Sequence, residues 1–291
     1  MRLGNFYGVD IYLNYFFLGL LALFFVAGVL VKGLLAFAIV LAHEFAHVAT
    51  ARRLGVPAGE VELLPFGGVS RIGGDLVMDP RREICVAAAG PASNLAMILL
   101  AVAGKNYGLW HDDLGPFFLQ CNILIALFNM LPALPLDGGR VYRAYLARRM
   151  GIREATHRAA AAGQFWAMVI ATLGALGIIF EIAGLDILIT AMFLFYAASR
   201  ERGQAAYLFV RHLMHKKEEL ARAGVLPAEH LVAVESTPLG DIVKPFVPQK
   251  FHLVLVLDRS YRYMGVVTEA EILDRLLEGG ADLTVGSLTG K

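Results

Sequence analysis

Residues 41–53 read LAHEFAHVATARR, and before the two final arginines they place three ionisable side chains in an otherwise apolar stretch. The stretch runs from Gly33 to Ala51, which is 19 residues, close to the roughly 20 that a helix needs to cross a bilayer. Ionisable groups are costly inside such a span and usually mark a functional site. The segment therefore predicts a transmembrane helix that carries a site within it.

His43 and His47 are four residues apart, so on a helix they share one face and can bind the same metal ion. Glu44, next to the first histidine, is placed to take a proton from water that the metal activates. A pair of histidines bonded only to helix neighbours is the alternative. It does not explain three ionisable residues within five positions, and we predict a catalytic zinc site.

A catalytic zinc ion has three protein ligands and an open fourth position. We expect Asp137 to be the third ligand, within the sequence NMLPALPLDGGR at residues 129–140. Pro132 and Pro135 interrupt a helix there, and the two glycines after the aspartate allow a tight turn, so irregular backbone can present the carboxylate inside the bundle. Alone, Asp137 would be interpreted as an interfacial carboxylate near Arg140. Beside two histidines that lack a third ligand, the metal-binding interpretation is favoured.

The composition of the 291-residue chain is that of a membrane protein: 57% of the residues are hydrophobic and 18% are charged, with a mean hydropathy of +0.61. A soluble protein carries about a quarter of its residues as charged side chains. We interpret six apolar runs as transmembrane helices, and expect the first to be retained rather than cleaved as a signal peptide. They are Ile11–Val31, Gly33–Ala51, Ile84–Gly104, Leu114–Leu136, Ala159–Phe180 and the shorter Ile187–Ser199.

Positive residues in the short loops predict the orientation of these spans, because cytoplasmic loops are enriched in Lys and Arg. One side of the membrane has only Lys32 and Lys105. The other side has eleven arginines, which are Arg52, Arg53, Arg71, Arg81, Arg82, Arg140, Arg143, Arg148, Arg149, Arg153 and Arg158. Both termini are therefore predicted to be cytoplasmic. The metal site, close in sequence to Arg52 and Arg140, is predicted near the cytoplasmic leaflet.

The remaining composition gives weaker indications. A net charge of +1 argues against nucleic acid as a partner. Cys85 and Cys121 lie in apolar runs without a second cysteine nearby, and we interpret them as buried small hydrophobic residues. The other histidines lack ligand spacing and are expected at the surface; they are His111, His157, His212, His215, His230 and His252.

The two motifs together resemble the site-2 protease family of intramembrane zinc metalloproteases. HEFAH at residues 43–47 is followed by N-x-x-P-x-x-P-x-D-G, which begins at Asn129. LLPFGG at residues 63–68 and AGPASN at residues 89–94 are also similar to segments of that family. The six-span plan with a cytosolic tail resembles the subgroup typified by stage IV sporulation protein FB, which processes an inactive precursor of a sporulation sigma factor.

The resemblance implies zinc on the two histidines and Asp137, with Glu44 as the general base. It also implies that Asn129 and Pro135 help to hold the substrate. For Asn129, a side chain that bonds one helix to another is nearly as good an interpretation. The expected partners are a membrane-associated protein substrate, such as a sigma-factor precursor, and inhibitory membrane proteins.

Residues 56–82 are rich in glycine and contain apolar pieces that are too short to span a bilayer. They predict either a hairpin at the cytoplasmic face or a connecting loop that dips into the interface. In the first case, an exposed strand edge would allow an extended substrate segment to be added by main-chain pairing.

Residues 200–291 have a soluble composition. We predict strands at residues 231–234, 252–257 and 263–267, and helices at residues 239–243 and 269–277. This order resembles a CBS (cystathionine-β-synthase) motif, a module that often binds adenine nucleotides. The resemblance implies that ATP or another adenine nucleotide contacts Thr268 and Glu271, whereas a purely structural docking domain is the alternative. Because such motifs pack in pairs, we expect a homo-oligomer formed through the tail.

The sequence thus predicts an α-helical polytopic membrane protein with six transmembrane helices and a small cytosolic α/β domain that is CBS-like. The expected domains are a membrane metalloprotease domain (1–199), a helical linker (200–225) and a regulatory domain (226–291). The predicted function is that of an intramembrane zinc endopeptidase that cuts near the cytoplasmic leaflet. A transporter regulated by the tail is disfavoured because the two halves show no evident repeat. A catalytically silent, receptor-like relative is disfavoured by the intact Glu44.

Overall fold

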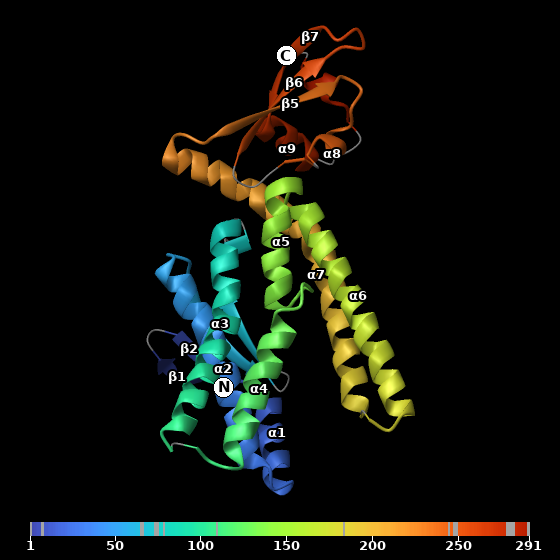
Figure 1. Cartoon of the computed structure of the whole chain (residues 1–291). Helices are drawn as coiled ribbons and strands as arrows, with labels where there is room; N and C mark the ends of the chain where they lie inside the picture. The colour runs from blue at the N-terminus through green and yellow to red at the C-terminus, as the bar shows by residue number, and fades with distance from the viewer. Residues whose placement is uncertain are drawn as a thin grey trace. The chain divides into compact units, whose positions relative to one another are not determined.

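The structure is a computed structural model, and it describes residues 2–6, 9–64, 67–72, 76–77, 79–108, 110–182, 184–243, 245–246, 250–277 and 283–289. The chain, drawn in Figure 1, divides into two compact units. The first consists of Met1–Tyr142 and Ala159–Ala198, and the second of Arg143–Arg158 and Ser199–Lys291. The predicted domain bounds at residues 199 and 225 stay predictions.

Helices lie at all six positions where the sequence predicts membrane spans. The long helices of the chain are α1 (Tyr15–Val26), α2 (Leu30–Arg53), α3 (Pro80–Asn106), α4 (Leu114–Asn129), α5 (Asp137–Met150), α6 (Ile152–Ile179) and α7 (Leu185–Ala223). Among the described residues, α2, α3 and α6 are long and apolar enough to cross a membrane. Helices α1 and α4 are apolar but shorter, with 12 and 16 residues. Length and composition therefore give three candidate spans among the described residues, and six spans remain a proposal.

The outward faces of these helices carry large apolar side chains. Leu99 and Leu100 of α3 are 62% and 72% exposed, and Leu127 of α4 and Leu173 of α6 are each 62% exposed. A protein in water rarely exposes apolar surface on this scale, whereas lipid chains would cover it. The exposed leucines and the three long apolar helices together indicate a membrane protein.

A four-stranded sheet lies in the first unit. Its strands, in spatial order, are β1 (Arg2–Phe6), β2 (Val9–Leu13), β3 (Ala58–Leu64) and β4 (Gly67–Ile72). The pair β2–β3 is parallel, and β1–β2 and β3–β4 are antiparallel, so a hairpin within residues 56–82 is confirmed, whereas its position at the cytoplasmic face stays a prediction. The prediction that the first span begins at Ile11 is wrong, because that residue lies in β2. Helix α1 begins at Tyr15, after Asn14, whose side chain accepts a hydrogen bond from the N–H of Phe16.

The chain between α4 and α5 is irregular, as its two prolines predict. Residues 130–136 form turns and bends, so the predicted fourth span ends at Asn129 instead of Leu136. The glycines after Asp137 are needed for a close approach of backbone rather than for a left-handed turn. A Cβ atom on Gly138 would lie 2.5 Å from the carbonyl oxygen of Leu131, and Gly139 meets the same segment as closely. The irregular segment therefore packs directly against the first turn of α5.

The second unit contains a three-stranded sheet with two short helices. Its elements are β5 (Ala228–Val234), α8 (Leu239–Ile242), β6 (Phe251–Leu257), β7 (Tyr263–Thr268), α9 (Glu269–Leu277) and the 3-10 helix η2 (Val285–Leu288). Strands β5 and β6 are parallel and β6 and β7 antiparallel, so the predicted order of strands and helices is confirmed. Val254 and Val256 of β6 pack against Leu239 and Ile272 of the two helices. A CBS identity for this unit stays a prediction.

Two predictions about burial are wrong. His252, expected at the surface, is fully buried because alternate residues of β6 face the core. Its ring stacks on Phe246 with the centroids 4.4 Å apart, and its Nδ1 lies 2.7 Å from Oε2 of Glu269. Cys85, expected to be buried, is exposed on α3, and Cys121 is half-buried. The predicted exposure of His212 and His215 concerns side chains outside the described part of the chain.

Candidate metal centre

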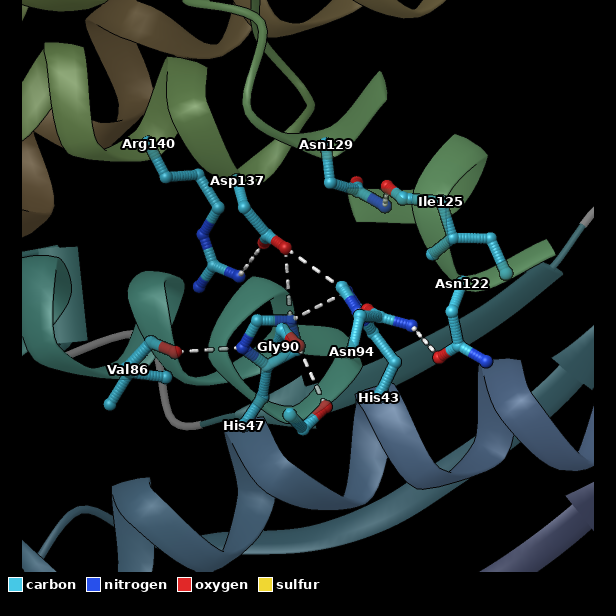
Figure 2. A network of polar contacts seen from close by, with 11 residues as sticks. His43, His47, Val86, Gly90, Asn94, Asn122, Ile125, Asn129, Asp137 and Arg140 are labelled. Atoms are coloured by element: carbon cyan, nitrogen blue, oxygen red, sulfur yellow. Dashed lines mark hydrogen bonds and ion pairs between the residues drawn. The ribbon is translucent and has the colours of Figure 1, made fainter. Parts of the chain in front are cut away.

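Two imidazole rings and one carboxylate meet in the first unit, as Figure 2 shows. His43 and His47, on successive turns of α2, are 3% and 2% exposed, and Asp137 at the start of α5 is 6% exposed. The two Nε2 atoms lie 3.2 Å apart, and each lies 3.1 Å from Oδ2 of Asp137. The three residues predicted as metal ligands therefore converge with one ligand atom each.

The triangle formed by these atoms fits a zinc ion. Zinc bonds of 2.0–2.1 Å at tetrahedral angles place neighbouring ligand atoms about 3.3 Å apart. The observed edges of 3.1, 3.1 and 3.2 Å are close to that value. Two imidazole nitrogens and one carboxylate oxygen are also a ligand set of catalytic zinc, in which the fourth position stays open. Within the described part of the chain, no other group of three His, Cys, Asp or Glu residues converges in this way.

Each histidine is held through its second ring nitrogen. Nδ1 of His47 lies 2.7 Å from the carbonyl oxygen of Val86 in α3. A carbonyl oxygen only accepts, so Nδ1 carries the hydrogen and Nε2 presents a lone pair to the metal position. Nδ1 of His43 bonds to Oδ1 of Asn94, which is also in α3. Histidines that bind metals commonly have such a partner, which fixes the orientation of the ring.

The carboxylate of Asp137 faces two different environments. Its Oδ2 atom points at the histidines, whereas Oδ1 lies 3.9 Å from the guanidinium of Arg140, one turn later in α5 (Figure 2). The two interpretations of Asp137 from the sequence, as a metal ligand and as a neighbour of Arg140, are therefore compatible. The arginine also adds positive charge on the side of the carboxylate that does not face the metal position.

The remaining residues predicted for this site have the following positions. Glu44 follows His43 in α2 and is half-buried, and its role as general base stays a prediction. Asn129 is the last residue of α4, and its side-chain amide donates to the carbonyl oxygen of Ile125 in the same helix at 3.0 Å. Pro135 is exposed in the irregular segment before α5. Substrate contacts by Asn129 and Pro135 stay predictions.

Thr268 and Glu271, predicted to contact a nucleotide, form the N-terminal cap of α9. The backbone N–H and the hydroxyl of Thr268 both donate to Oε2 of Glu271 at 2.8 Å, and the N–H of Glu271 donates to Oγ1 of Thr268 at 3.3 Å. This reciprocal arrangement is a capping box, which satisfies backbone donors that a helix start leaves open. The two side chains therefore have a local structural role.

The sequence analysis assigns no role to three residues of the site, although two of them, Gly90 and Asn94, lie within the family-like segment AGPASN. Asn94 of α3 and Asn122 of α4 are fully buried, and Gly90 of α3 lies against both imidazole rings. A partial signal existed, because an amide within an apolar helix needs a hydrogen-bond partner. The sequence contains no spacing that identifies a histidine of another helix as that partner.

The residues of the candidate metal centre lie in a part of the chain that matches a known protein family. Residues 33–110 and 111–173 match the model of peptidase family M50, and these ranges include all three predicted ligands. The chain is 32% identical over 265 residues to "Putative zinc metalloprotease Rip3" of Mycobacterium tuberculosis. The aligned residues cover 85% of this chain and 64% of the relative. It is 30% identical over 120 residues to stage IV sporulation protein FB of Bacillus subtilis, which covers 41% of each chain.

A solved structure has a similar fold. The site-2 protease from Methanocaldococcus jannaschii matches with a TM-score of 0.52 and 24% identity, over 69% of this chain and 94% of that one. At this identity the likeness concerns the fold alone. The chain spans 64% of the length of the mycobacterial relative, slightly less than two thirds.

Proposed function

We propose that this chain, which belongs to peptidase family M50, is a membrane-embedded zinc metalloprotease of the site-2 protease type. The proposal rests on the triangle formed by Nε2 of His43, Nε2 of His47 and Oδ2 of Asp137. The distances between these atoms are close to those between three ligand atoms of a tetrahedral zinc ion. The family and the relatives named as zinc metalloproteases support zinc as the metal. The proposed reaction is hydrolysis of a peptide bond near the cytoplasmic leaflet.

The roles of the residues follow from their chemistry. His43, His47 and Asp137 hold zinc, which when bound acts as a Lewis acid toward the reacting groups. Glu44 takes a proton from the attacking water and returns it to the leaving amine. We assign substrate positioning to Asn129 and Pro135 because the N-x-x-P-x-x-P-x-D-G motif at residues 129–138, which includes them, resembles that of the site-2 protease family.

An extended substrate would pair with the edge of the sheet in the first unit. Peptide recognition by strand addition needs a strand with one unpaired side. Among the described strands, β1 and β4 end the order β1-β2-β3-β4, and we propose β4 for such pairing because it belongs to the hairpin within residues 56–82. Main-chain pairing would hold the substrate in the extended form that a protease needs.

The proposed substrate is a membrane-associated regulatory protein such as a sigma-factor precursor. This proposal is supported by similarity to stage IV sporulation protein FB over part of the chain. We also propose six spans with both termini in the cytoplasm, and inhibitory membrane proteins as further partners. The apolar helices α1 and α4 and the apolar start of α7 support the six spans.

For the tail, we propose a regulatory CBS-like domain that self-associates and binds an adenine nucleotide near Thr268 and Glu271. Self-association is supported by the face of the sheet that points away from α8 and α9. Val232, Leu255 and Val266 are in register across this face, and the two valines are 67% and 46% exposed. Light scattering of the detergent-solubilised chain should give the mass of a dimer, and calorimetry should detect ATP binding. A strictly monomeric chain would contradict self-association, and a lack of ATP binding would contradict the nucleotide site.

Metal content and hydrolysis together test the proposed activity. We expect one zinc ion per purified chain, and cleavage of fluorescently labelled β-casein that stops on treatment with 1,10-phenanthroline and returns on adding zinc. A variant with both His43→Ala and His47→Ala should lose zinc and cleavage. Full zinc occupancy in that variant would overturn the metal site. A zinc-loaded chain without hydrolysis would favour the catalytically silent alternative.

A further inference from the structure

Two buried asparagines connect α4 to a ligand of the metal centre (Figure 2). The side-chain amide of Asn122 donates to the carbonyl oxygen of Phe118 at 2.9 Å. The amide of Asn94 donates to Oδ1 of Asn122 at 2.9 Å, and Oδ1 of Asn94 contacts Nδ1 of His43. Both asparagines are fully buried, so water does not compete for these bonds.

The direction of every bond follows from the backbone carbonyl at the far end. The oxygen of Phe118 only accepts, so Asn122 must turn its NH₂ group toward it and its Oδ1 toward Asn94. Asn94 must then donate to Asn122 and turn its own Oδ1 toward His43. An amide oxygen also only accepts, so the hydrogen of the imidazole lies on Nδ1. The lone pair is thereby left on Nε2, which faces Asp137 and His47.

We propose that Asn94 is a positioning residue that fixes the ring orientation and the tautomer of His43 for zinc, and that Asn122 acts only by orienting Asn94. The inference rests on the proposed zinc site. It separates the two histidines: His47 is held by the backbone carbonyl of Val86, which no side-chain substitution removes, whereas His43 depends on two side chains. Removal of an outer partner of a metal ligand typically lowers metal affinity 10- to 100-fold.

The competing explanation is that the two asparagines only join helices α3 and α4. Zinc affinity, measured by competition with a chelating dye, separates the two explanations, because a purely structural bond would change the thermal stability of the metal-free chain and leave affinity unchanged. Asn94→Leu should bind zinc roughly 10- to 100-fold more weakly. Asn94→Asp keeps an acceptor for Nδ1 but loses the donor to Asn122, so it should lose less affinity than Asn94→Leu. Ser93→Ala is the matched control, because among the described residues the hydroxyl of Ser93 donates to the carbonyl oxygen of Gly90 in its own helix.

A double-mutant cycle tests the role of Asn122. Asn122→Leu should weaken zinc binding less than Asn94→Leu does, because Asn94 can still contact His43 in one of its two amide orientations. In the Asn94→Leu background, Asn122→Leu should have no further effect on affinity. The visible spectrum of the Co²⁺-substituted chain should change in Asn94→Leu and stay unchanged in Ser93→Ala.

The outcomes are distinguishable from failure of the zinc site itself. The unvaried chain and His43→Ala report on whether zinc binds, whereas the asparagine variants report on how His43 is held. Zinc affinity within twofold of the unvaried chain in Asn94→Leu would overturn the inference. Equal losses of zinc affinity in Asn94→Leu and Asn94→Asp would overturn it as well. So would a loss of affinity on adding Asn122→Leu to Asn94→Leu that is as large as the loss from Asn122→Leu alone. If Asn94→Leu fails to fold, retained zinc binding in Asn94→Asp and a loss of affinity in Asn122→Leu support it, and an unchanged affinity in Asn122→Leu overturns it.

Discussion

Gly90 of α3 lies directly against the imidazole ring of His47 in α2. A Cβ atom at Gly90 would overlap Nε2 of His47, and it would also lie 2.6 Å from Cε1 of His43. Contacts this short force a neighbouring group to move, and the neighbours here are the two rings whose Nε2 atoms face the metal position. The absence of a side chain at residue 90 is therefore what allows α3 to approach the metal centre.

Gly90→Ala should weaken zinc binding while the helices persist. An added methyl group in a packed interior costs about 1–3 kcal/mol, which corresponds to a loss of roughly 5- to 150-fold in affinity if the cost falls on the metal-binding geometry. Gly19→Ala is the control, because a Cβ atom there meets nothing within 4 Å and alanine favours the helix. Chelator competition measures both variants. Unchanged zinc affinity in Gly90→Ala would show that the rings can move aside without cost.

Glu44→Gln should keep zinc and lose hydrolysis. The amide has nearly the shape of the carboxylate, so the proposed ligands His43 and His47 should be unaffected, but it cannot accept the proton of the attacking water. General bases contribute typically 10²- to 10⁴-fold, and casein cleavage should fall by about that factor. Metal analysis of the same sample supplies the control. Near-normal cleavage by a zinc-loaded Glu44→Gln chain would mean that another group is the base.

The convergence of the three proposed metal ligands could be anticipated from the sequence because each has a local signal. The four-residue spacing of His43 and His47 defines a helix face, and the prolines and glycines around Asp137 define an interruption. The triangle in the structure joins these two signals across 94 residues of separation. The partners Asn94 and Asn122 could not be predicted in the same way, because their roles depend on how three separate helices pack.

The sequence predicts the wrong environment for two residues, Ile11 and His252, because each belongs to a strand. Ile11 lies in a long apolar run, but pairing with β3 makes it part of a strand. The lack of ligand spacing at His252 predicts a surface residue, yet His252 occupies the same alternating face of β6 as Val254 and Val256, so it points into the core. For Ile11 a contact with a residue far away in the sequence decides the outcome, whereas for His252 the strand that contains it decides which face the side chain occupies.

His252→Leu should destabilise the tail without affecting zinc. His252 and Glu269 are 0% and 1% exposed, and loss of the imidazole removes a buried partner of the carboxylate. A buried polar group deprived of a partner costs about 1–3 kcal/mol, more if it is charged. Hydrogen exchange of β6 and α9 in the full chain should become faster, whereas His230→Leu, at an exposed position of β5, should leave it unchanged. Equal exchange in His252→Leu and the unvaried chain would contradict the prediction.

The orientation in the membrane is testable by labelling single cysteines. Arg52 and Arg53 end α2, and Arg81 and Arg82 lie in the first turn of α3, so all four are at the ends joined by the β3–β4 hairpin. Positive charge at these ends predicts that they face the cytoplasm. Tyr107 follows the opposite end of the 27-residue helix α3 and is 84% exposed, so it should face outward.

In a chain with Cys85→Ala and Cys121→Ala, a membrane-impermeant maleimide should label Tyr107→Cys in intact bacterial spheroplasts, and should label Arg53→Cys only after permeabilisation. Both positions are exposed, so the difference reports the side of the membrane rather than burial. The cysteine-free chain controls for background, and zinc binding by each variant confirms that the fold is kept. Labelling of Arg53→Cys from outside, with Tyr107→Cys protected, would reverse the topology and move the metal centre to the opposite leaflet.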